Sequence, residues 1–411
     1  LLRGSAGDDL LYTGSGFDRV EAGTGDDTIY GRDSGVIQGG SGDDRIFLTG
    51  GRQLVAGDAI DPDTGWFAAR VHGGPGSDLI VGSDLDENLY ADSPAPYRAA
   101  EGHADRLEDR NEIRAGAGDD LLVGGDGRDA LFGDAGNDRL VSRSGMDLLH
   151  GGSGDDEFLL TGRGGKEVFG GDGDDTITGT VRVEAALSDA ENAVIVDAGE
   201  GNDVLDLAAD LTAQSAFELH GKGGDDYLSA SAVARGSIVT LDGGEGDDFI
   251  VLNPEATNFQ GQSVDGRGVA FGGQGADSFV VKFHPRAEGS GAVPEIRDFR
   301  PGTDQVILDA RGPVDGLEDV SRAVEGLLSG SRGFIYDPET DVSTLYEAVT
   351  FDDGTTAQYE IVRFVGNTPD ALVERGSILI LPPELEGVDA DALNDWRART
   401  GWTENGARAE P

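Results

Sequence analysis

The chain has 411 residues, of which 67 are glycine and none is cysteine, and its formal net charge is −48. The absence of cysteine excludes a disulfide framework and a thiol site. Such a negative charge argues against nucleic acid and anionic membrane surfaces as partners and favours cations. No apolar run approaches the roughly 18 residues that a transmembrane helix needs, so no transmembrane segment is predicted.

The glycines fall at fixed places in nine-residue units. Within residues 1–90, which form a first block, the units are GSAGDDLLY, TGSGFDRVE, AGTGDDTIY, GGSGDDRIF and GGPGSDLIV. In each of them place four is Gly, place six is Asp and place eight is a large apolar residue. The next unit, GSDLDENLY, keeps the spacing but has Glu87 at place six. The chain opens inside such a unit without a Met, so we expect it to be a portion of something longer.

Residues 91–114 interrupt the pattern with Pro94, Pro96 and a run of mixed charge, which predicts an inserted loop or a short helix lying off the roll. A second block covers residues 115–178. It contains five consecutive units, AGAGDDLLV, GGDGRDALF, GDAGNDRLV, SRSGMDLLH and GGSGDDEFL, then an irregular stretch and GGDGDDTIT. A strict short period of this kind predicts a solenoid, in which each unit is one rung.

The units lengthen from residue 179 to 291. Turns begin at Ala198, Gly221, Gly243 and Gly272, and an apolar strand precedes each turn, as in NAVIVDAGEGNDVLDL. These turns are separated by 23, 22 and 29 residues. We therefore expect wider sheets in this block, with loops on one edge.

Residues 292–383 contain no such turns and are predicted to form a C-terminal β cap, because the open end of a solenoid exposes strand edges. Alternating hydrophobicity predicts the strands Gln305–Leu308, Phe334–Tyr336, Thr344–Phe351, Gln358–Phe364 and Ser377–Leu381. A helix is expected at Leu317–Leu328. Residues 384–411 form a polar tail with one possible helix, Ala390–Arg399.

The residue types in one unit predict a calcium site. Glycines allow the backbone to turn tightly and aim its carbonyls at one point, and Asp adds a carboxylate there. Calcium takes 6–8 oxygen ligands of this kind. Carboxylates that stack in register repel one another unless a cation lies between them. The sequence thus predicts an all-β fold: a calcium-stabilised parallel solenoid, with two rungs per coil, a strand from each rung in one of two facing sheets, and a β-rich cap.

One such Asp alone would be read as a residue that caps a turn, but fifteen in register favour metal binding. The predicted metal ligands at place six are Asp9, Asp18, Asp27, Asp44, Asp78, Asp120, Asp129, Asp138, Asp147, Asp156, Asp175, Asp203, Asp226, Asp248 and Asp277. Further ligands are expected from the backbone carbonyls of turn residues such as Gly116, Gly118, Gly125, Gly127, Gly152, Gly154, Gly171 and Gly173. Asp or Asn at place five is expected to shape the turn or face solvent.

The nonapeptide GGxGxDxUx, in which U is a large apolar residue, is the calcium-binding signature of RTX (repeats-in-toxin) proteins. The chain resembles that family over residues 1–283, and Glu295–Leu308 resembles the segment that closes many RTX rolls. The resemblance implies a parallel β-roll that binds several calcium ions. It also implies export by the type I secretion machinery, and an extracellular or bacterial cell-surface location.

We expect the chain to fold on calcium binding after secretion and to serve a structural, adhesive or export-assisting role, without being an enzyme itself. The sequence has no HExxH zinc motif and no GxSxG nucleophile elbow, so no catalytic residue is assigned. One alternative is that the chain is the C-terminal part of a secreted hydrolase, lyase or epimerase whose catalytic domain lies upstream of Leu1. Another places a carbohydrate-binding or catalytic site on the rungs of residues 179–291, with a glycan or cell-surface partner.

Overall fold

The structure is a computed structural model. It describes residues 1–14, 16–32, 35–49, 69–83, 85–91, 109–183, 193–211, 216–233, 238–252, 255–257, 263–265, 267–282, 293–309, 332–350, 356–373 and 378–380. The chain divides into two compact units. Unit 1 comprises Leu1–Arg182 and Ala190–Gly199, and unit 2 comprises Val183–Asp189 and Glu200–Pro411.

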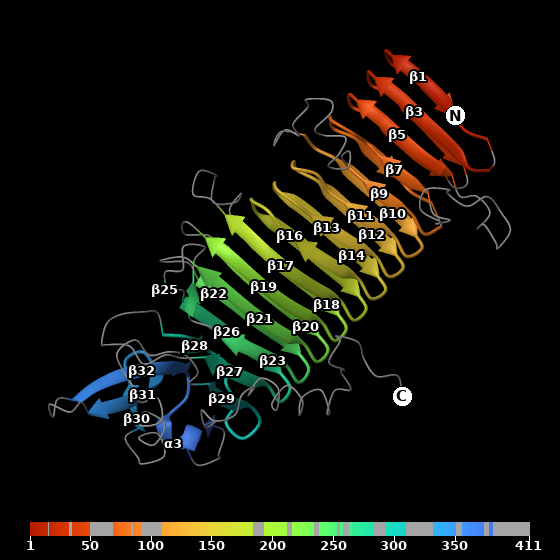
Figure 1. The fold of residues 1–411 in the computed structure, drawn as a ribbon. Coiled ribbons are helices and arrows are strands. Elements are labelled where there is room, and N and C mark those ends of the chain that lie inside the picture. Colours follow the sequence, from red (N-terminus) through yellow and green to blue (C-terminus); the bar gives the residue numbers. More distant parts are fainter. Residues whose placement is uncertain are drawn as a thin grey trace. The chain divides into compact units, whose positions relative to one another are not determined.

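Unit 1 consists of two parallel sheets, and successive strands alternate between them (Figure 1). Sheet A contains, in spatial order, β1 (Leu2–Ala6), β3 (Asp18–Thr24), β5 (Gly35–Ser41), β7 (Arg70–His72), β9 (Asn88–Tyr90), β11 (Leu121–Val123), β13 (Arg139–Ser142), β15 (Glu157–Leu160) and β17 (Thr176–Val183). Sheet B contains β2 (Leu10–Tyr12), β4 (Thr28–Arg32), β6 (Arg45–Thr49), β8 (Leu79–Val81), β10 (Glu112–Ala117), β12 (Ala130–Ala135), β14 (Asp147–Ser153), β16 (Lys166–Asp172) and β18 (Val194–Glu200).

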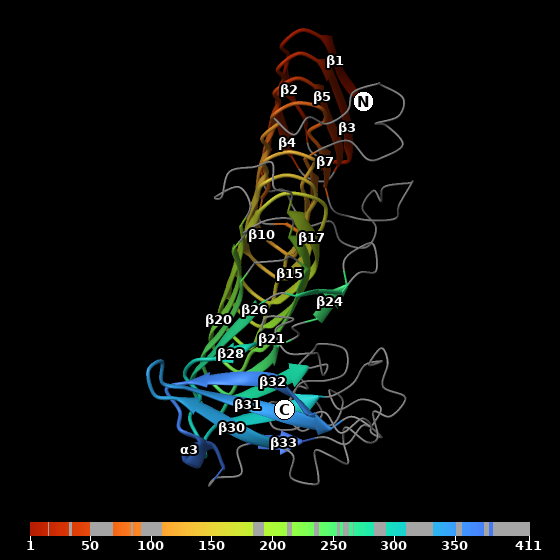
Figure 2. The same ribbon diagram turned by 90° about the vertical axis from the view of Figure 1, so that its left-hand side faces the viewer.

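The register of the strands aligns equal places of the repeat. In sheet A, Leu122 pairs with Leu140, and Leu140 pairs with Phe158. Figure 2 shows the two sheets of unit 1 facing each other, with a turn at either edge of each coil. We call the turns that lead from sheet B into sheet A edge 1, and those that lead from sheet A into sheet B edge 2. Two nine-residue rungs therefore complete one coil, as predicted.

The core consists of the place-eight side chains, which point between the sheets because strand side chains alternate. All fifteen are at most 8% exposed, which confirms them as core. They are Leu11, Val20, Ile29, Ile46, Ile80, Leu122, Leu131, Leu140, Leu149, Phe158, Ile177, Leu205, Leu228, Ile250 and Phe279. The places on either side face outward, as the alternating burial of β15 and β16 shows. Further apolar residues of the same strands, such as Leu160 and Leu207, are buried as well and complete the core.

Unit 2 continues the same alternation with longer strands. Sheet A of this unit has β19 (Val204–Leu211), β21 (Tyr227–Val233), β23 (Phe249–Leu252), β27 (Ser278–Lys282), β29 (Gln305–Asp309) and β33 (Ile378–Ile380). Sheet B has β20 (Ala216–Gly223), β22 (Ile238–Glu245), β26 (Arg267–Gln274), β28 (Glu295–Ile296), β32 (Thr356–Val365), β31 (Val342–Thr350) and β30 (Arg332–Asp337). The glycine–aspartate turns of unit 2 lie at edge 1, where sheet B strands lead into sheet A strands.

The last strands of unit 2 close the roll. β30, β31 and β32 pair antiparallel, while β32 pairs parallel with β28. A short helix, α3 (Pro369–Val373), follows, and β24 (Glu255–Thr257) pairs antiparallel with β25 (Ser263–Asp265) in a separate two-stranded sheet. All five strands predicted between residues 305 and 381 are confirmed to within two residues at their ends.

The predicted helices Leu317–Leu328 and Ala390–Arg399 and the tail 384–411 lie outside the described residues. The same holds for residues 92–108 of the predicted inserted loop. The end of that segment belongs to the roll, because β10 begins at Glu112 and pairs with both β8 and β12. The boundaries of the predicted blocks stay predictions, since the compact units divide the chain differently.

The core assignment predicts that truncating an inward leucine lowers the free energy of unfolding much more than truncating an outward one. In calcium-saturated protein, we expect Leu140→Ala to lower the free energy of unfolding by about 2–5 kcal/mol, because it leaves a cavity at a fully buried site. Leu10→Ala is the control: Leu10 is 59% exposed at an outward place, and its truncation should change stability by less than about 1 kcal/mol. Chemical denaturation measures both. Equal effects would contradict the inward assignment of place eight.

Candidate metal centre

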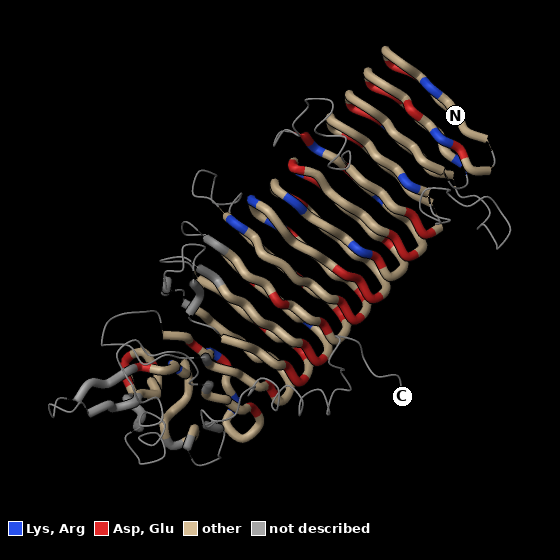
Figure 3. Tube along the Cα trace, in the orientation of Figure 1, with Lys and Arg blue, Asp and Glu red and all other residues tan. Residues whose placement is uncertain are grey.

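The place-six residues line up along the edges of the coils. Figure 3 shows acidic residues gathered at the turns of edge 1. On edge 2 of unit 1, the place-six residues in order are Asp9, Asp27, Asp44, Asp78, Asn111, Asp129, Asp147 and Lys166. On edge 1 the row includes Glu87, Asp120, Asp138, Asp156 and Asp175 in unit 1, and Asp203, Asp226, Asp248, Asp277 and Asp304 in unit 2.

At most of these places, one oxygen of the place-six carboxylate accepts a hydrogen bond from the backbone of the preceding rung on its edge. Oδ1 of Asp138 accepts a hydrogen bond of 2.8 Å from the backbone N–H of Asp120. Oδ1 of Asp156 accepts one of 2.7 Å from the N–H of Asp138. The same bond links Asp203 to Asp226 and Asp226 to Asp248 in unit 2. This bond orients each carboxylate and leaves its other oxygen directed into the turn.

The second oxygen, Oδ2, is buried and accepts no hydrogen bond from the described residues in eight of these aspartates. They are Asp9, Asp27, Asp44, Asp120, Asp138, Asp156, Asp226 and Asp248. Burying a carboxylate oxygen without a donor is costly unless a cation binds it. A row of such atoms is therefore the signature of a metal-binding edge, and the residues fit calcium because every nearby group is a hard oxygen.

Place-one glycine leaves room for the carboxylate. A Cβ at Gly151 would collide with Oδ2 of Asp156 and would lie 2.7 Å from the carbonyl oxygen of Gly170, the place-one residue of the next rung on edge 1. Oxygens from two successive rungs therefore converge on one point. Gly152 and Gly154, at places two and four, have φ of +125° and +119°, a conformation that allows the carbonyls of the turn to point away from the strand ladder.

Place five forms a second ladder that runs in the opposite direction along the edge. Oδ1 of Asp119 accepts a bond of 2.8 Å from the N–H of Asn137, and Oδ1 of Asn137 accepts one of 2.8 Å from the N–H of Asp155. These residues are exposed. Sequence reasoning had assigned place five to turn shaping or solvent without finding this ladder. A turn that has Asp or Asn at place five is thus held to both neighbours, to the preceding one through place six and to the following one through place five.

Burial makes the metal-free carboxylates poor acids. Burial, and after it the charge of neighbouring carboxylates, raises the pKa of Asp120 to about 8 and that of Asp156 to about 7 from the ordinary 3.8. For Asp226 the pKa reaches about 10, mainly through burial and then through the charge of Asp203. Because a bound divalent cation would reverse this preference, the stacked carboxylates form a site that requires positive charge.

The fifteen predicted aspartates are not equivalent. Asp18, in the first coil, is only partly buried, and the residue that pairs with it on the next strand is Gly35. Oδ2 of Asp129 accepts a bond of 2.6 Å from the N–H of Gly125, a contact internal to its own turn. Oδ2 of Asp147 and Oδ2 of Asp277 both bind side-chain cations. The role of each of the fifteen as a ligand stays a prediction.

Place six also holds residues that sequence reasoning missed. Asn111 takes the Asp place on edge 2, where its amide oxygen accepts from the N–H of Asp78, and Asp304 takes it on edge 1. The sequence signal differs between the two. Asn111 has no Gly at place four, so its signal was weak, whereas Asp304 follows Gly302 at the normal spacing. The third, Lys166, replaces an acid by a base.

Most ligands at these turns have to be backbone carbonyls. Among the described residues, no group of three or more His, Asp or Glu side chains converges in a way that could hold a metal ion. Six of the eight glycines predicted to supply carbonyls have positive φ, and Gly125 and Gly127 are the two that do not. A search of side chains alone would therefore pass over this site.

Comparison with protein families settles the kind of repeat. The model of the RTX calcium-binding nonapeptide repeat matches residues 2–34, 36–52, 107–140, 141–165, 167–180 and 237–253. This chain carries RTX calcium-binding repeats. The chain is a calcium-binding parallel β-roll protein, with Ca²⁺ bound at multiple sites, and its repeats indicate a secreted protein.

Among solved structures, this chain is similar to the extracellular lipase LipA from Serratia marcescens, with 14% identity and a TM-score of 0.17. The match covers 82% of this chain and 45% of the lipase chain, so this chain spans less than half of that protein. No curated protein matches the sequence. None of the helices in the described part of the chain is both long and apolar enough to cross a membrane.

The raised pKa values predict an unusual pH dependence without calcium. In the metal-free roll, the pKa is about 7 for Asp44 and about 8 for Asp120, against an ordinary 3.8, so protonation favours the folded state. This stabilisation is complete below about pH 4 and is lost as the pH rises through those folded-state values. In EGTA, the β signal in circular dichroism should fall between pH 4 and pH 8. With calcium in excess it should persist at pH 8. A calcium-free signal that rises with pH would contradict this account.

Proposed function

We propose that this RTX chain is an extracellular calcium-dependent folding module, exported by the type I machinery and folded outside the cell, where it serves a structural, adhesive or export-assisting role. The observation that carries the proposal is the row of buried Oδ2 atoms with no hydrogen bond from the described residues. They stack rung upon rung beside glycine turns in both units, so the roll cannot close without positive charge along its edges.

The chain's own residues would hold the ions. The carboxylates with an open Oδ2, such as Asp138 and Asp156, would each contribute that oxygen. Carbonyls from places two and four of the turn, such as those of Gly152 and Gly154, would supply others. Calcium suits this set because it accepts many oxygens in flexible geometry, whereas magnesium requires a tight octahedral shell.

Binding and folding are one process in this arrangement. Each ion takes oxygens that come together only when the turn has formed and its neighbour lies in register. In a calcium-poor compartment, repulsion between carboxylates and an ordering cost of about 1–2 kcal/mol per residue keep the chain open. Where calcium is plentiful, the binding free energy becomes folding free energy. An exported chain would therefore stay extended during passage and fold at its destination.

The other functional hypotheses rest on less. A catalytic domain upstream of Leu1 and a glycan or catalytic site on the rungs of residues 179–291 both stay predictions. The described geometry of those rungs shows the same carboxylate row as in unit 1, from Asp203 to Asp277, which supports calcium binding there as well.

A calcium titration tests the proposal directly. We expect the β signal in circular dichroism at neutral pH to be small in EGTA and to rise cooperatively at roughly 10⁻⁴–10⁻³ M calcium, the range of extracellular calcium modules. Magnesium at equal concentration should produce far less signal. A chain that keeps its full β signal and thermal midpoint in EGTA at pH 8 would refute calcium-coupled folding.

A single carboxylate can be tested with a matched control. Asp156→Asn keeps the size of the side chain but weakens the Oδ2 ligand at a site that is 2% exposed. We expect the apparent calcium affinity for folding to fall by about tenfold or more. Glu157→Gln removes the same charge from the next residue, whose side chain is 48% exposed, and should leave the midpoint within about twofold. Equal shifts for the two variants would contradict a ligand role for Asp156.

A further inference from the structure

A lysine is buried within one of the turns on edge 2. Lys166 begins β16, and its side chain is 0% exposed. Its Nζ donates hydrogen bonds to the carbonyl oxygen of Arg143 at 2.6 Å, to the carbonyl oxygen of Gly145 at 2.9 Å and to Oδ2 of Asp147 at 2.8 Å. A buried charge of this kind persists only when its donors are matched by acceptors.

Those three oxygens occupy defined places in the repeat. In the unit SRSGMDLLH, Arg143 is place two, Gly145 is place four and Asp147 is place six. In the other rungs these places supply the two carbonyls and the carboxylate proposed as calcium ligands. The ammonium therefore lies where the ion would lie. It has three N–H donors for three oxygens, and a neutral amine, with two, could not satisfy all of them.

If the ammonium lies at the ion position, Oδ2 of Asp147 should have a partner where Oδ2 in neighbouring turns has none among the described residues, and this is what the structure shows. Oδ2 of Asp147 accepts from Lys166 and, at 2.5 Å, from the hydroxyl of Ser142. Oδ2 of Asp138 and Oδ2 of Asp156, in the turns that precede and follow it in sequence, accept no hydrogen bond from the described residues. Ser142 stands at place one, where the consensus has Gly. The departure from the consensus at Ser142 thus adds a second donor to the carboxylate that binds the ammonium.

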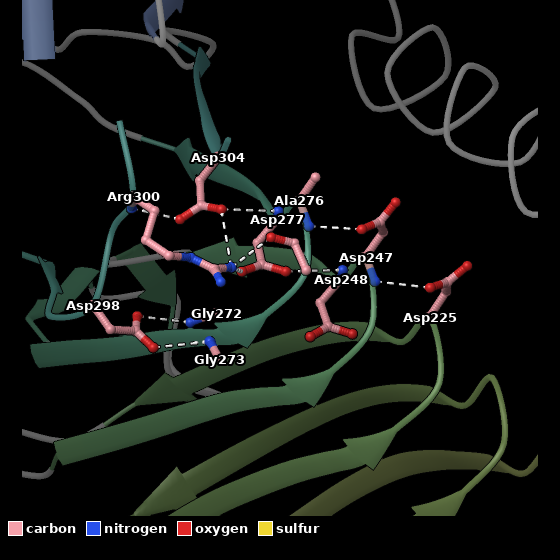
Figure 4. Close-up of polar contacts among 11 residues, drawn as sticks. Asp225, Asp247, Asp248, Gly272, Gly273, Ala276, Asp277, Asp298, Arg300 and Asp304 are labelled. Atoms are coloured by element: carbon pink, nitrogen blue, oxygen red, sulfur yellow. Dashed lines mark hydrogen bonds and ion pairs between the residues drawn. The ribbon is translucent and has the colours of Figure 1, made fainter. Parts of the chain in front are cut away.

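Unit 2 shows a related arrangement at its last glycine–aspartate turn (Figure 4). A guanidinium nitrogen of Arg300 lies 2.5 Å from the carbonyl oxygen of Gly275, at place four, and 3.1 Å from Oδ2 of Asp277, at place six. It also lies 3.3 Å from Oδ1 of Asp304. Beside it, Asp298 accepts hydrogen bonds from the N–H groups of Gly272 and Gly273. As with Lys166 and Asp147, a side-chain cation here binds both the place-four carbonyl and Oδ2 of the place-six aspartate.

We infer that Lys166 is a resident cation that takes the place of calcium in the turn of residues 142–147, so that this rung closes without a metal ion. The inference rests on the proposed function and refines it, because it removes Asp147 from the predicted calcium ligands. Since the ammonium is covalently attached, its occupancy does not depend on calcium concentration. This rung would then order ahead of its neighbours as calcium rises and offer them a template.

Three substitutions test the inference by counting calcium ions bound per full-length chain, with equilibrium dialysis against radioactive calcium at saturation. Lys166→Met removes the ammonium and keeps the length of the side chain, and we expect it to bind one ion more than the wild type. Lys166→Asp restores the consensus residue at place six, within the glycine-rich turn TGRGGKEVF, and should also gain one ion. Arg139→Met removes the same charge at place seven, outside the proposed ligand set, where the side chain is 49% exposed, and should leave the count unchanged.

The outcomes separate the inference from the proposed function. If the wild type binds calcium and folds with it, but neither Lys166 variant gains an ion, the inference is overturned and calcium-coupled folding stands. Failure of both variants to fold in saturating calcium, while the wild type does, would also overturn it, because calcium should replace the lost ammonium. A wild-type chain that binds no calcium would overturn both. A gain of one ion in either folded Lys166 variant, with none in Arg139→Met, supports the inference.

Discussion

The roll can form only if the negative charge of the place-six carboxylates, which are buried side by side along its edges, is neutralised. At most rungs, one oxygen of the place-six aspartate accepts a hydrogen bond from the backbone of the preceding rung and the other points into a glycine turn. Burial raises the pKa of two of these aspartates, Asp120 and Asp248, to about 8. In this geometry the rungs stay together only when protons or cations neutralise the buried carboxylates along the edge. Otherwise the rungs separate.

The remaining features of the rung follow from this requirement. Place one is usually glycine because the carboxylate of its own rung lies where a Cβ would be, as at Gly151 and Gly243. Place eight supplies a buried apolar group in every glycine–aspartate rung, and residues such as Leu160 and Phe249 add to it, but this burial does not balance the charge along the edges. The place-five ladder adds a hydrogen bond from each turn to the next without adding buried charge. Hydrophobic burial and cation binding therefore act together.

The two units meet the requirement differently. Unit 1 carries place-six carboxylates on both edges, whereas the glycine–aspartate turns of unit 2 lie on edge 1 alone. Where a consensus turn is interrupted, the chain uses other means: an amide in Asn111, a longer acid in Glu87 that binds the backbone and hydroxyl of Ser83, and a buried base in Lys166. A roll assembled in this way would have stretches that differ in their need for calcium, which gives folding a direction along the chain.

The sequence by itself determined the period, the inward place, the fold class and the calcium chemistry, because all of these depend on residues that lie within one unit of nine. It also located the five strands of the cap from their alternation. Only the tertiary structure decided which residues share an edge, because neighbours there come from rungs about two units apart, such as Asp120 and Asp138, or further across an insertion, such as Asp78 and Asn111. For the same reason, the sequence could not separate aspartates with an open oxygen from Asp147: the cation that binds Asp147 is nineteen residues away.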